Sequence, residues 1–258
     1  MSDKDSKDNK PGINKIDIHS TESDLSGLAG MFESSLRKFK GLAFVFAMIP
    51  IAFAYILGFG IAMTPGYIFT SLTYSATNDM NFLLHALLMG MTLGFSYITY
   101  GLTLILVVPI LNKLMPFKVR PWRGNWYSMQ VIPWYYHNAL VQLVRFTFLD
   151  FVTPTPINIF FYKAMGMKIG KNCIVNTSNI SDPCLIEIED NVTIGGSVTI
   201  IAHYAQSGFM VFAPVKIKKG ATIGLKATIM GDVEIGENVV IKPHEVIFPK
   251  TRIPNKVR

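Results

Sequence analysis

The sequence predicts an α + β membrane protein in which a helical hairpin and a surface helix precede a triangular β-solenoid. Between Gly41 and Asn112 the chain carries a single formal charge, at Asp79. The tryptophans follow that stretch, at positions 122, 126 and 134. From Met167 onward, isoleucines recur every six residues. Half of the 258 residues are apolar and 16% are charged, which is too hydrophobic for an ordinary soluble domain.

Residues 1–36 form a polar segment with mixed charge, which we predict to be a disordered cytoplasmic tail. Its start has no apolar stretch of signal-peptide type. Residues 1–40 hold seven basic and seven acidic residues, so the net charge of +7 lies in the rest of the chain. This excess favours a membrane surface or a phosphorylated cofactor as the electrostatic partner, and we expect no nucleic acid.

Two apolar stretches, residues 41–63 and 82–111, are long enough to cross a bilayer at about 1.5 Å per residue. The loop that we expect between them, residues 64–81, has no Lys or Arg. Basic residues flank the two stretches on their other sides: Arg37, Lys38, Lys40, Lys113, Lys118, Arg120 and Arg123. The positive-inside rule therefore predicts cytoplasmic N- and C-termini, at the inner membrane if the protein is bacterial.

Small and polar residues within these stretches allow two interpretations. Gly90 and Gly94 form a G-x-x-x-G pair, which either lets two helices approach closely or reflects the high glycine content of membrane helices. His85 lies near the outer end of the second stretch, where we expect a solvated side chain rather than part of a proton path.

Residues 135–152 resemble a mostly apolar helix with two charges, Arg145 and Asp150. The tryptophans and tyrosines at its start favour the headgroup level of a membrane. We therefore predict an interfacial or half-inserted helix rather than a third span, ended by the T-P-T-P sequence that follows. The hairpin and this helix together make up a predicted region 37–165.

The third region is defined by its period. Isoleucines occupy positions 188, 194 and 200, and then 217, 223, 229, 235, 241, 247 and 253. A period of six fits neither an α-helix nor a simple alternating strand. It is typical of a solenoid in which six residues form a short strand and a turn, and three such units complete a coil of 18 residues. Successive coils lie about 4.8 Å apart, with the isoleucines stacked inside.

Three segments, IGKNCIVN (169–176), LIEIEDNVTIGGSVTIIAH (185–203) and the repeats of 213–247, resemble the hexapeptide-repeat acyltransferases. The order of these motifs is similar to the sugar and xenobiotic O-acetyltransferase branch. The resemblance implies a left-handed parallel β-helix over residues 166–258. The lead-in TPTPINIFFYKAMGMKIGKN (153–172) is similar to the C-terminal membrane domains of polylysine-synthetase-like enzymes, whose adenylation and carrier modules have no counterpart in this sequence.

His203 is the predicted catalytic residue, because the resemblance implies a general base at this position. A neutral imidazole takes up and returns a proton near working pH. The alternative is a structural histidine satisfied by a backbone carbonyl. A base is usually oriented by a second group, and the candidates are Asp182, Glu187, Glu189 and Asp190, of which we select Asp182. Asn179 is predicted to hold an acceptor hydroxyl.

The excursion loop 205–214 interrupts the period and contains the apolar sequence GFMVF. Such a sequence is unfavourable at an exposed corner unless it is covered. It would line an acyl or lipid acceptor site, dip into the membrane, or pack on a neighbouring subunit.

The co-substrate implied by the resemblance is an acyl-coenzyme A or an acyl carrier protein thioester, bound between two solenoids of a homotrimer, with no metal. The small residues Gly224 and Ala227 match the donor groove, whereas Lys226 departs from it. The remaining predicted donor contacts are basic residues that would meet phosphates or an acidic carrier protein: Lys242, Lys250 and Arg252.

The sequence thus predicts a membrane-anchored acyltransferase that moves an acyl group from a thioester to a hydroxyl or amine of a membrane-associated acceptor. One alternative is a stand-alone condensation unit that forms amide bonds from carrier-bound aminoacyl thioesters. Another is a non-catalytic membrane scaffold.

Overall fold

The computed structural model describes residues 20–23 and 25–256. Most of the predicted disordered tail lies outside these residues, but its last part is helical and forms α1 (Gly27–Lys38). This helix is ordered by buried polar contacts: the Glu33 carboxylate accepts a hydrogen bond from the backbone N–H of Met129 at 3.0 Å and pairs with Arg37 at 2.6 Å. The prediction of disorder is therefore wrong for residues 27–36.

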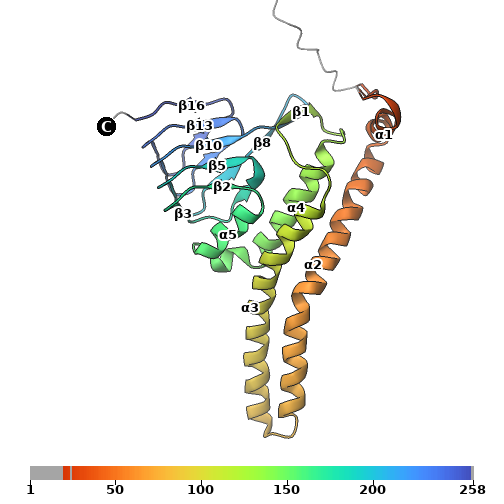
Figure 1. The fold of residues 1–258 in the computed structure, drawn as a ribbon, viewed down its shortest axis with the longest axis vertical. Coiled ribbons are helices and arrows are strands. Elements are labelled where there is room, and N and C mark those ends of the chain that lie inside the picture. Colours follow the sequence, from red (N-terminus) through yellow and green to blue (C-terminus); the bar gives the residue numbers. More distant parts are fainter. Residues whose placement is uncertain (1–19, 24, 257–258) are drawn as a thin grey trace, which may run out of the picture.

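Two long helices, α2 (Lys40–Thr77) and α3 (Phe82–Leu114), form an antiparallel hairpin that protrudes from the rest of the molecule (Figure 1). The predicted loop over 64–81 is wrong, because α2 continues to Thr77 and only residues 78–81 connect the helices. Hydroxyl groups support this extension by bonding to carbonyls one turn earlier, as Thr70 does to Gly66 at 2.8 Å. By length and composition, both helices are able to cross a membrane.

Polar contacts join the two helices in the protruding part of the hairpin. The hydroxyls of Thr73 and Thr92 are 3.0 Å apart, and the Thr77 hydroxyl lies 2.7 Å from Nδ1 of His85. His85 is therefore bonded to the neighbouring helix rather than only solvated. The expectation failed because the first helix was predicted to end before it reached His85.

The close approach of α2 and α3 occurs at Gly66, not at the predicted glycine pair. A Cβ atom on Gly66 would lie 2.9 Å from Cβ of Ser96, whereas nothing lies within 4 Å of a Cβ on Gly90 or Gly94. Among residues 20–23 and 25–256, the G-x-x-x-G pair thus makes no helix–helix contact.

We expect Gly66→Val to destabilise the hairpin by about 1–3 kcal/mol, the usual effect of overpacking, and Gly90→Val to have little effect. Thermal unfolding of the two variants in the same detergent tests this difference. Equal losses would show that the helices do not meet at Gly66.

The segment after the hairpin returns beside it and connects it to the solenoid. Strand β1 (Trp122–Asn125) is followed by α4 (Val131–Thr147), the 3₁₀ turn η1 (Leu149–Val152) and α5 (Pro156–Ala164). The predicted helix 135–152 is thus α4 and η1 together. One side of α4 packs against the hairpin and the other against the solenoid (Figure 1), so most of its side chains are buried.

The C-terminal region is a parallel β-helix with three sheets. Sheet 1 has the order β16-β13-β10-β5-β2, sheet 2 the order β14-β11-β6-β3, and sheet 3 the order β15-β12-β7-β4. The strands are β2 (Lys168–Ile169), β3 (Ile174–Val175), β4 (Ile180–Ser181), β5 (Ile186–Ile188), β6 (Thr193–Ile194), β7 (Thr199–Ile201), β10 (Val215–Ile217), β11 (Thr222–Ile223), β12 (Thr228–Ile229), β13 (Val233–Ile235), β14 (Val240–Ile241), β15 (Val246–Ile247) and β16 (Arg252–Ile253).

The isoleucine period becomes the core of this β-helix. Along sheet 1, Ile188, Ile217, Ile235 and Ile253 are direct partners in the parallel register, and the other two sheets repeat the arrangement. Equivalent residues of successive coils lie on the same sheet, paired in register. This arrangement confirms the predicted triangular solenoid. Left-handed winding stays a prediction from the resemblance.

Helix α5 covers the first coil, where a β-helix would otherwise expose unpaired strand edges. The side-chain amide of Asn158 donates to the carbonyl of Val175 at 2.8 Å, and the Tyr162 hydroxyl donates to the carbonyl of Ser178 at 2.9 Å. Both side chains are fully buried. The α5 segment thus ties the helical region to the β-helix.

The excursion loop is covered by the chain itself. It forms a hairpin of β8 (His203–Gln206) and β9 (Phe209–Phe212), and β9 pairs with β1 in an antiparallel sheet of order β1-β9-β8. The ring of Phe212 lies 5.6 Å from that of Trp122. The sequence did not indicate this cover, because β1 lies about 90 residues earlier in the sequence, and the three predicted placements of the loop stay predictions.

Candidate active site

His203 and Asp182 are brought together at one corner of the β-helix, although 21 residues separate them. Strand β4 pairs with β7, so the residues that follow these two strands lie on adjacent coils. The Nδ1 atom of His203 is 2.5 Å from Oδ2 of Asp182. The Asp182 side chain is fully buried, whereas 23% of the His203 side chain is exposed. The pair therefore joins a partly solvent-accessible imidazole to a buried carboxylate.

Helix α4 holds the other oxygen of this carboxylate. Trp134 Nε1 donates to Oδ1 of Asp182 at 2.7 Å, and the side-chain amide of Asn138 donates to the same atom at 2.5 Å. The Asn138 oxygen in turn accepts a hydrogen bond from the Asp182 backbone N–H at 3.2 Å. Asp182 has φ 58°, a left-handed conformation that aspartate adopts more readily than most residues. Together with the contact to His203, these hydrogen bonds hold both oxygens of the Asp182 carboxylate in place.

A carboxylate that accepts from Nδ1 leaves Nε2 of His203 as the atom with a free lone pair. The imidazole is also confined by rings. The Trp134 ring lies 4.9 Å from that of His203 in an edge-to-face arrangement, and it stacks on Phe212 at 5.4 Å. The site therefore has the parts of a general base: a reachable nitrogen, a fixed tautomer and a fixed ring position.

Sequence analysis did not find Trp134 and Asn138. They are four residues apart, so they lie on one face of α4. That spacing was visible, but in an aromatic-rich helix it is equally typical of packing. The contact itself depends on how α4 lies across the β-helix, which the sequence pattern does not determine.

His137 lies beside these residues on α4 and is 3% exposed. Its Nδ1 is 3.0 Å from the side-chain oxygen of Asn112. Burial lowers the pKa of His137 to about 4, since it disfavours the charged ring; the nearby Asp182 opposes this effect and Lys118 adds to it. The imidazole is therefore neutral in the folded protein near neutral pH.

This lowered pKa makes stability depend on pH. Between about pH 6.5 and pH 4 the unfolded chain binds a proton at His137 that the folded chain does not, so stability falls as the pH decreases through this window. The loss attributable to His137 is about 3 kcal/mol at most. We expect His137→Gln, which is never charged, to show a shallower fall in urea unfolding from pH 7 to pH 4.5. Parallel curves for the two proteins would contradict this assignment.

Asn179 does not contact His203. Its side-chain oxygen accepts a hydrogen bond from the Arg145 guanidinium at the other end of β4. Its predicted role in holding an acceptor hydroxyl stays a prediction.

The predicted donor residues fall on two corners of the β-helix. Gly224, Lys226 and Ala227 lie at the turn between sheets 2 and 3, and Lys242 lies on the same corner one coil later, where a Cβ on Gly224 would meet its carbonyl carbon at 2.7 Å. Lys250 lies on the corner of His203, two coils away. Arg252, on the adjacent strand, is paired with Asp232 and also lies 4.0 Å from Glu234. Its charge is therefore already compensated, whereas the donor contacts as a set stay a prediction.

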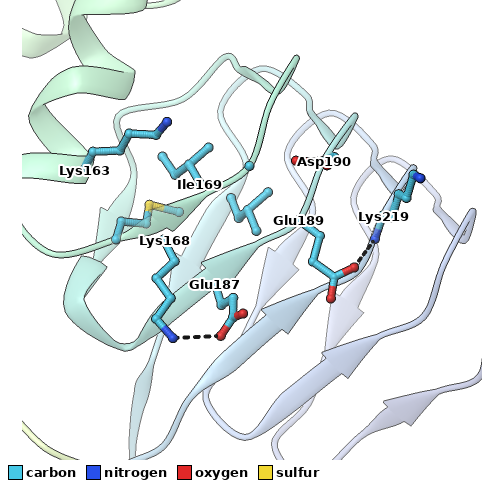
Figure 2. Close-up of a pocket in the computed structure, with 10 residues that line it drawn as sticks. Lys163, Lys168, Ile169, Glu187, Glu189, Asp190 and Lys219 are labelled. Atoms are coloured by element: carbon cyan, nitrogen blue, oxygen red, sulfur yellow. Dashed lines mark hydrogen bonds and ion pairs between the residues drawn. The ribbon is translucent and has the colours of Figure 1, made fainter.

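Two further features lie outside this pair. A hollow of about 640 Å³ lies beside α5, β2 and β5 (Figure 2). In it, Lys168 forms an ion pair with Glu187 at 3.4 Å, and the Glu189 carboxylate accepts a hydrogen bond from the backbone N–H of Lys219 at 2.9 Å. Cys184 is a free thiol whose pKa burial raises to about 12. The thiol is therefore protonated, and a cysteine nucleophile has no support here.

No protein-family model matches this sequence. A stretch of 158 residues is 21% identical to delta-poly-L-ornithine synthetase of Acinetobacter baumannii; it covers 61% of this chain and 12% of that protein, so the chain spans about an eighth of its relative's length.

Solved structures similar to the chain include two serine acetyltransferases. That of Neisseria gonorrhoeae is 14% identical with a TM-score of 0.31, over 74% of this chain and 87% of the other. That of Brucella abortus is 15% identical with a TM-score of 0.30, over 81% and 93%. The strand register, rather than these scores, assigns the fold.

The strand register bears out the β-helical part of the resemblance that the sequence indicated. The chain resembles the hexapeptide-repeat acyltransferases in its β-helical region. Its curated relative fits the similarity of the lead-in to polylysine-synthetase-like enzymes.

Proposed function

We propose that this protein is a membrane-anchored acyltransferase with His203 as the general base. The observation that carries the proposal is the buried carboxylate of Asp182, 2.5 Å from Nδ1 of a partly exposed imidazole at a corner of the β-helix. A backbone carbonyl would satisfy a structural histidine, whereas this histidine pairs with a fully buried carboxylate that two further donors hold. Burying a charge is unfavourable unless hydrogen bonds or a paired group compensate for it. A carboxylate that is buried in this way is able to orient a base.

In the proposed reaction, Nε2 of His203 takes the proton of an acceptor hydroxyl or amine as its heteroatom attacks the thioester carbonyl. The carbon–sulfur bond breaks, and the proton passes from the imidazolium to the leaving thiolate, so the base is regenerated. Asp182 stabilises the imidazolium in between. The donor is an acyl-coenzyme A or the thioester of an acyl carrier protein.

The membrane position follows from where polar and aromatic groups lie on the hairpin. The Tyr97 hydroxyl donates to the carbonyl of Thr147 at 2.9 Å, so the end of α4 lies level with Tyr97. From Phe82 to Tyr97 the hairpin rises by about 22 Å, which is less than the roughly 30 Å of a hydrocarbon core. The core therefore ends just beyond this level, where exposed aromatic side chains surround the end of α4: Tyr67, Phe146, Phe151 and Phe160.

This placement supports an interfacial position for the end of α4 and for α5, and it keeps the β-helix in water. The basic residues that flank the hairpin lie at the end of the molecule that carries the β-helix, and Asp79 lies at the tip. By the positive-inside rule, the β-helix and the C-terminus are cytoplasmic.

The outward faces of the β-helix support a homotrimer. Sheet 1 presents a ladder of charges, among them Lys168, Glu187 and Glu234. Sheets 2 and 3 instead present uncharged β-branched side chains: Ile174, Thr193, Thr199, Thr222, Thr228, Val240 and Val246. Exposed neutral faces of this kind are typical of surfaces that meet other subunits.

The test is thiol release from a panel of acyl-coenzyme A donors by detergent-purified protein, with total membrane lipid extract as acceptor. Release that depends on both the lipid and His203 supports the proposal. If no coenzyme A thioester and no carrier-bound thioester is consumed with any acceptor, the proposal is wrong.

A second candidate function is amide-bond formation. It is favoured by the similarity to a polyornithine synthetase, which by its name joins amino acids. This function predicts that only aminoacyl thioesters on a separate carrier protein are consumed and that the acceptor is an amine. Presenting the same acyl group on coenzyme A and on a carrier protein distinguishes the two functions.

A further inference from the structure

A groove runs along the hairpin to the end of α4. Its lower part, of about 600 Å³, lies between α2 and α3 and is lined by Gly66, Tyr67 and Tyr100 among others. Its upper part, of about 410 Å³, is lined by Arg145, Asp150 and aromatic side chains at the end of α4. Tyr97 and Thr147 line both parts, so the two adjoin. One continuous groove therefore leads from an apolar wall to a charged pocket.

The groove lies at the level where the proposed membrane ends. The hydrogen bond from the Tyr97 hydroxyl to the Thr147 carbonyl marks the boundary between its two parts. Tyrosine favours the headgroup level, because one end of its ring is apolar and the other is polar. The apolar part of the groove faces the hydrocarbon core, and the part with Arg145 lies within about 8 Å of the level where the core ends.

Arg145 supplies the charge in the upper part. One of its N–H groups donates to Asn179, and within residues 20–23 and 25–256 no other hydrogen bond or ion pair of its guanidinium is recorded. A guanidinium has five N–H donors, which leaves enough for a bidentate contact with a phosphate. Asp150 accepts a hydrogen bond from Ser178 with one oxygen, and its other oxygen is available to a donor group.

We propose that this groove binds a phosphate-bearing membrane lipid, with its chain against Gly66, Tyr67 and Tyr100 and its phosphate on Arg145. The amine or hydroxyl of such a headgroup would meet Asp150. An apolar groove that ends at a cation beside a carboxylate matches this ligand class. A soluble anion would leave the apolar part of the groove unoccupied.

Along α4, the end of the groove at Arg145 lies about two helical turns from Asn138, which contacts Asp182. Arg145 contacts Asn179, and Asn138, seven residues earlier on α4, contacts Asp182, three residues further along the coil. Seven residues of helix and three of extended chain both measure about 10 Å. If the lipid is the acceptor, which rests on the proposed function, the acylated group lies about 10 Å beyond the phosphate. An extended headgroup, such as that of a glycolipid, has this reach.

The test uses full-length protein in nanodiscs of phosphatidylcholine that contain a photoactivatable lipid with a diazirine on its chain. Three such lipids are compared: phosphatidylglycerol, phosphatidylethanolamine and diacylglycerol, which has no phosphate. We expect the first two to label peptides that contain Tyr67 or Tyr100, and diacylglycerol to label them about tenfold less, the effect of one charge-assisted contact. Equal labelling by diacylglycerol, or no labelling of these peptides, would overturn the proposal.

Variants locate the phosphate contact. Arg145→Gln is expected to reduce labelling by phosphatidylglycerol about tenfold. Arg145→Lys should retain most of it, and Lys163→Gln, which removes a cation on α5, should leave it unchanged. Unchanged labelling of Arg145→Gln contradicts the proposal, and the lipid comparison in the wild type decides the matter if this variant does not fold. Labelling does not depend on an acyl donor or on His203, so a protein that is labelled but transfers no acyl group refutes the function and not the site.

Discussion

Replacing His203 by alanine is expected to lower kcat for acyl transfer by about 10²–10⁴-fold, the usual contribution of a positioned general base. The KM of the thioester should change little, because the imidazole acts on the acceptor proton and not on the donor. Thiol release at saturating donor measures this effect. Thermal stability is also expected to fall, because the change leaves Oδ2 of the fully buried Asp182 carboxylate without its partner, so thiol release is compared below the unfolding temperature of both proteins.

His244 provides a matched control. It is also a corner histidine of the β-helix, but it has a positive φ, is exposed and lies on a different corner. His244→Asn should leave kcat unchanged, because asparagine tolerates this backbone conformation. A similar loss in both variants would mean that corner histidines stabilise the fold, and equal activity of His203→Ala and the wild type would favour the scaffold hypothesis.

The double variant His203→Ala/Asp182→Asn shows whether the two residues act as a unit. If the carboxylate works only through the imidazole, removing it from a protein that already lacks His203 costs no further activity. Additive losses would give Asp182 a role of its own.

The sequence predicted the β-helix because its cause is local and repeated. Every sixth residue from Ile217 to Ile253 must face the same interior, and a period of this kind has few other solutions. The site was predicted in part for the same reason. Once the coils are in register, the residues after β4 and β7 must be neighbours, so Asp182 was a reasonable choice as the partner of His203.

The helical region was predicted less well, because its features depend on contacts between distant segments. Helix α2 continues past residue 63 because Thr and Ser hydroxyls are satisfied by the helix itself and by α3, and neither effect is visible in a hydropathy profile. The cover over Phe212 comes from Trp122, and the order of α1 comes from the contact of Glu33 with Met129. In the last two cases the partner lies about 90 residues away.

The contact between α4 and Asp182 has a functional consequence. Trp134 and Asn138 are positioning residues in the proposed reaction, because they touch the carboxylate and not the acceptor. Trp134→Phe keeps the ring that packs against His203 and Phe212 but removes the N–H donor to Oδ1. We expect kcat to fall about tenfold to a hundredfold, about 1.4–2.7 kcal/mol in activation free energy, with an unchanged KM.

Trp126→Phe is the control for this prediction. Its indole N–H donates to the Tyr135 hydroxyl at 2.7 Å and not to the site. Both variants lose one hydrogen bond of an indole N–H, so both should unfold at a lower temperature, and Trp134→Phe by the larger amount because its acceptor is a buried carboxylate. Only Trp134→Phe should lower kcat. If the two variants lose activity in proportion to their stability, the indole of Trp134 supports the fold alone. If only Trp134→Phe loses activity, α4 takes part in positioning the catalytic residues. The β-helix then depends on the helical region for the groups that hold Asp182.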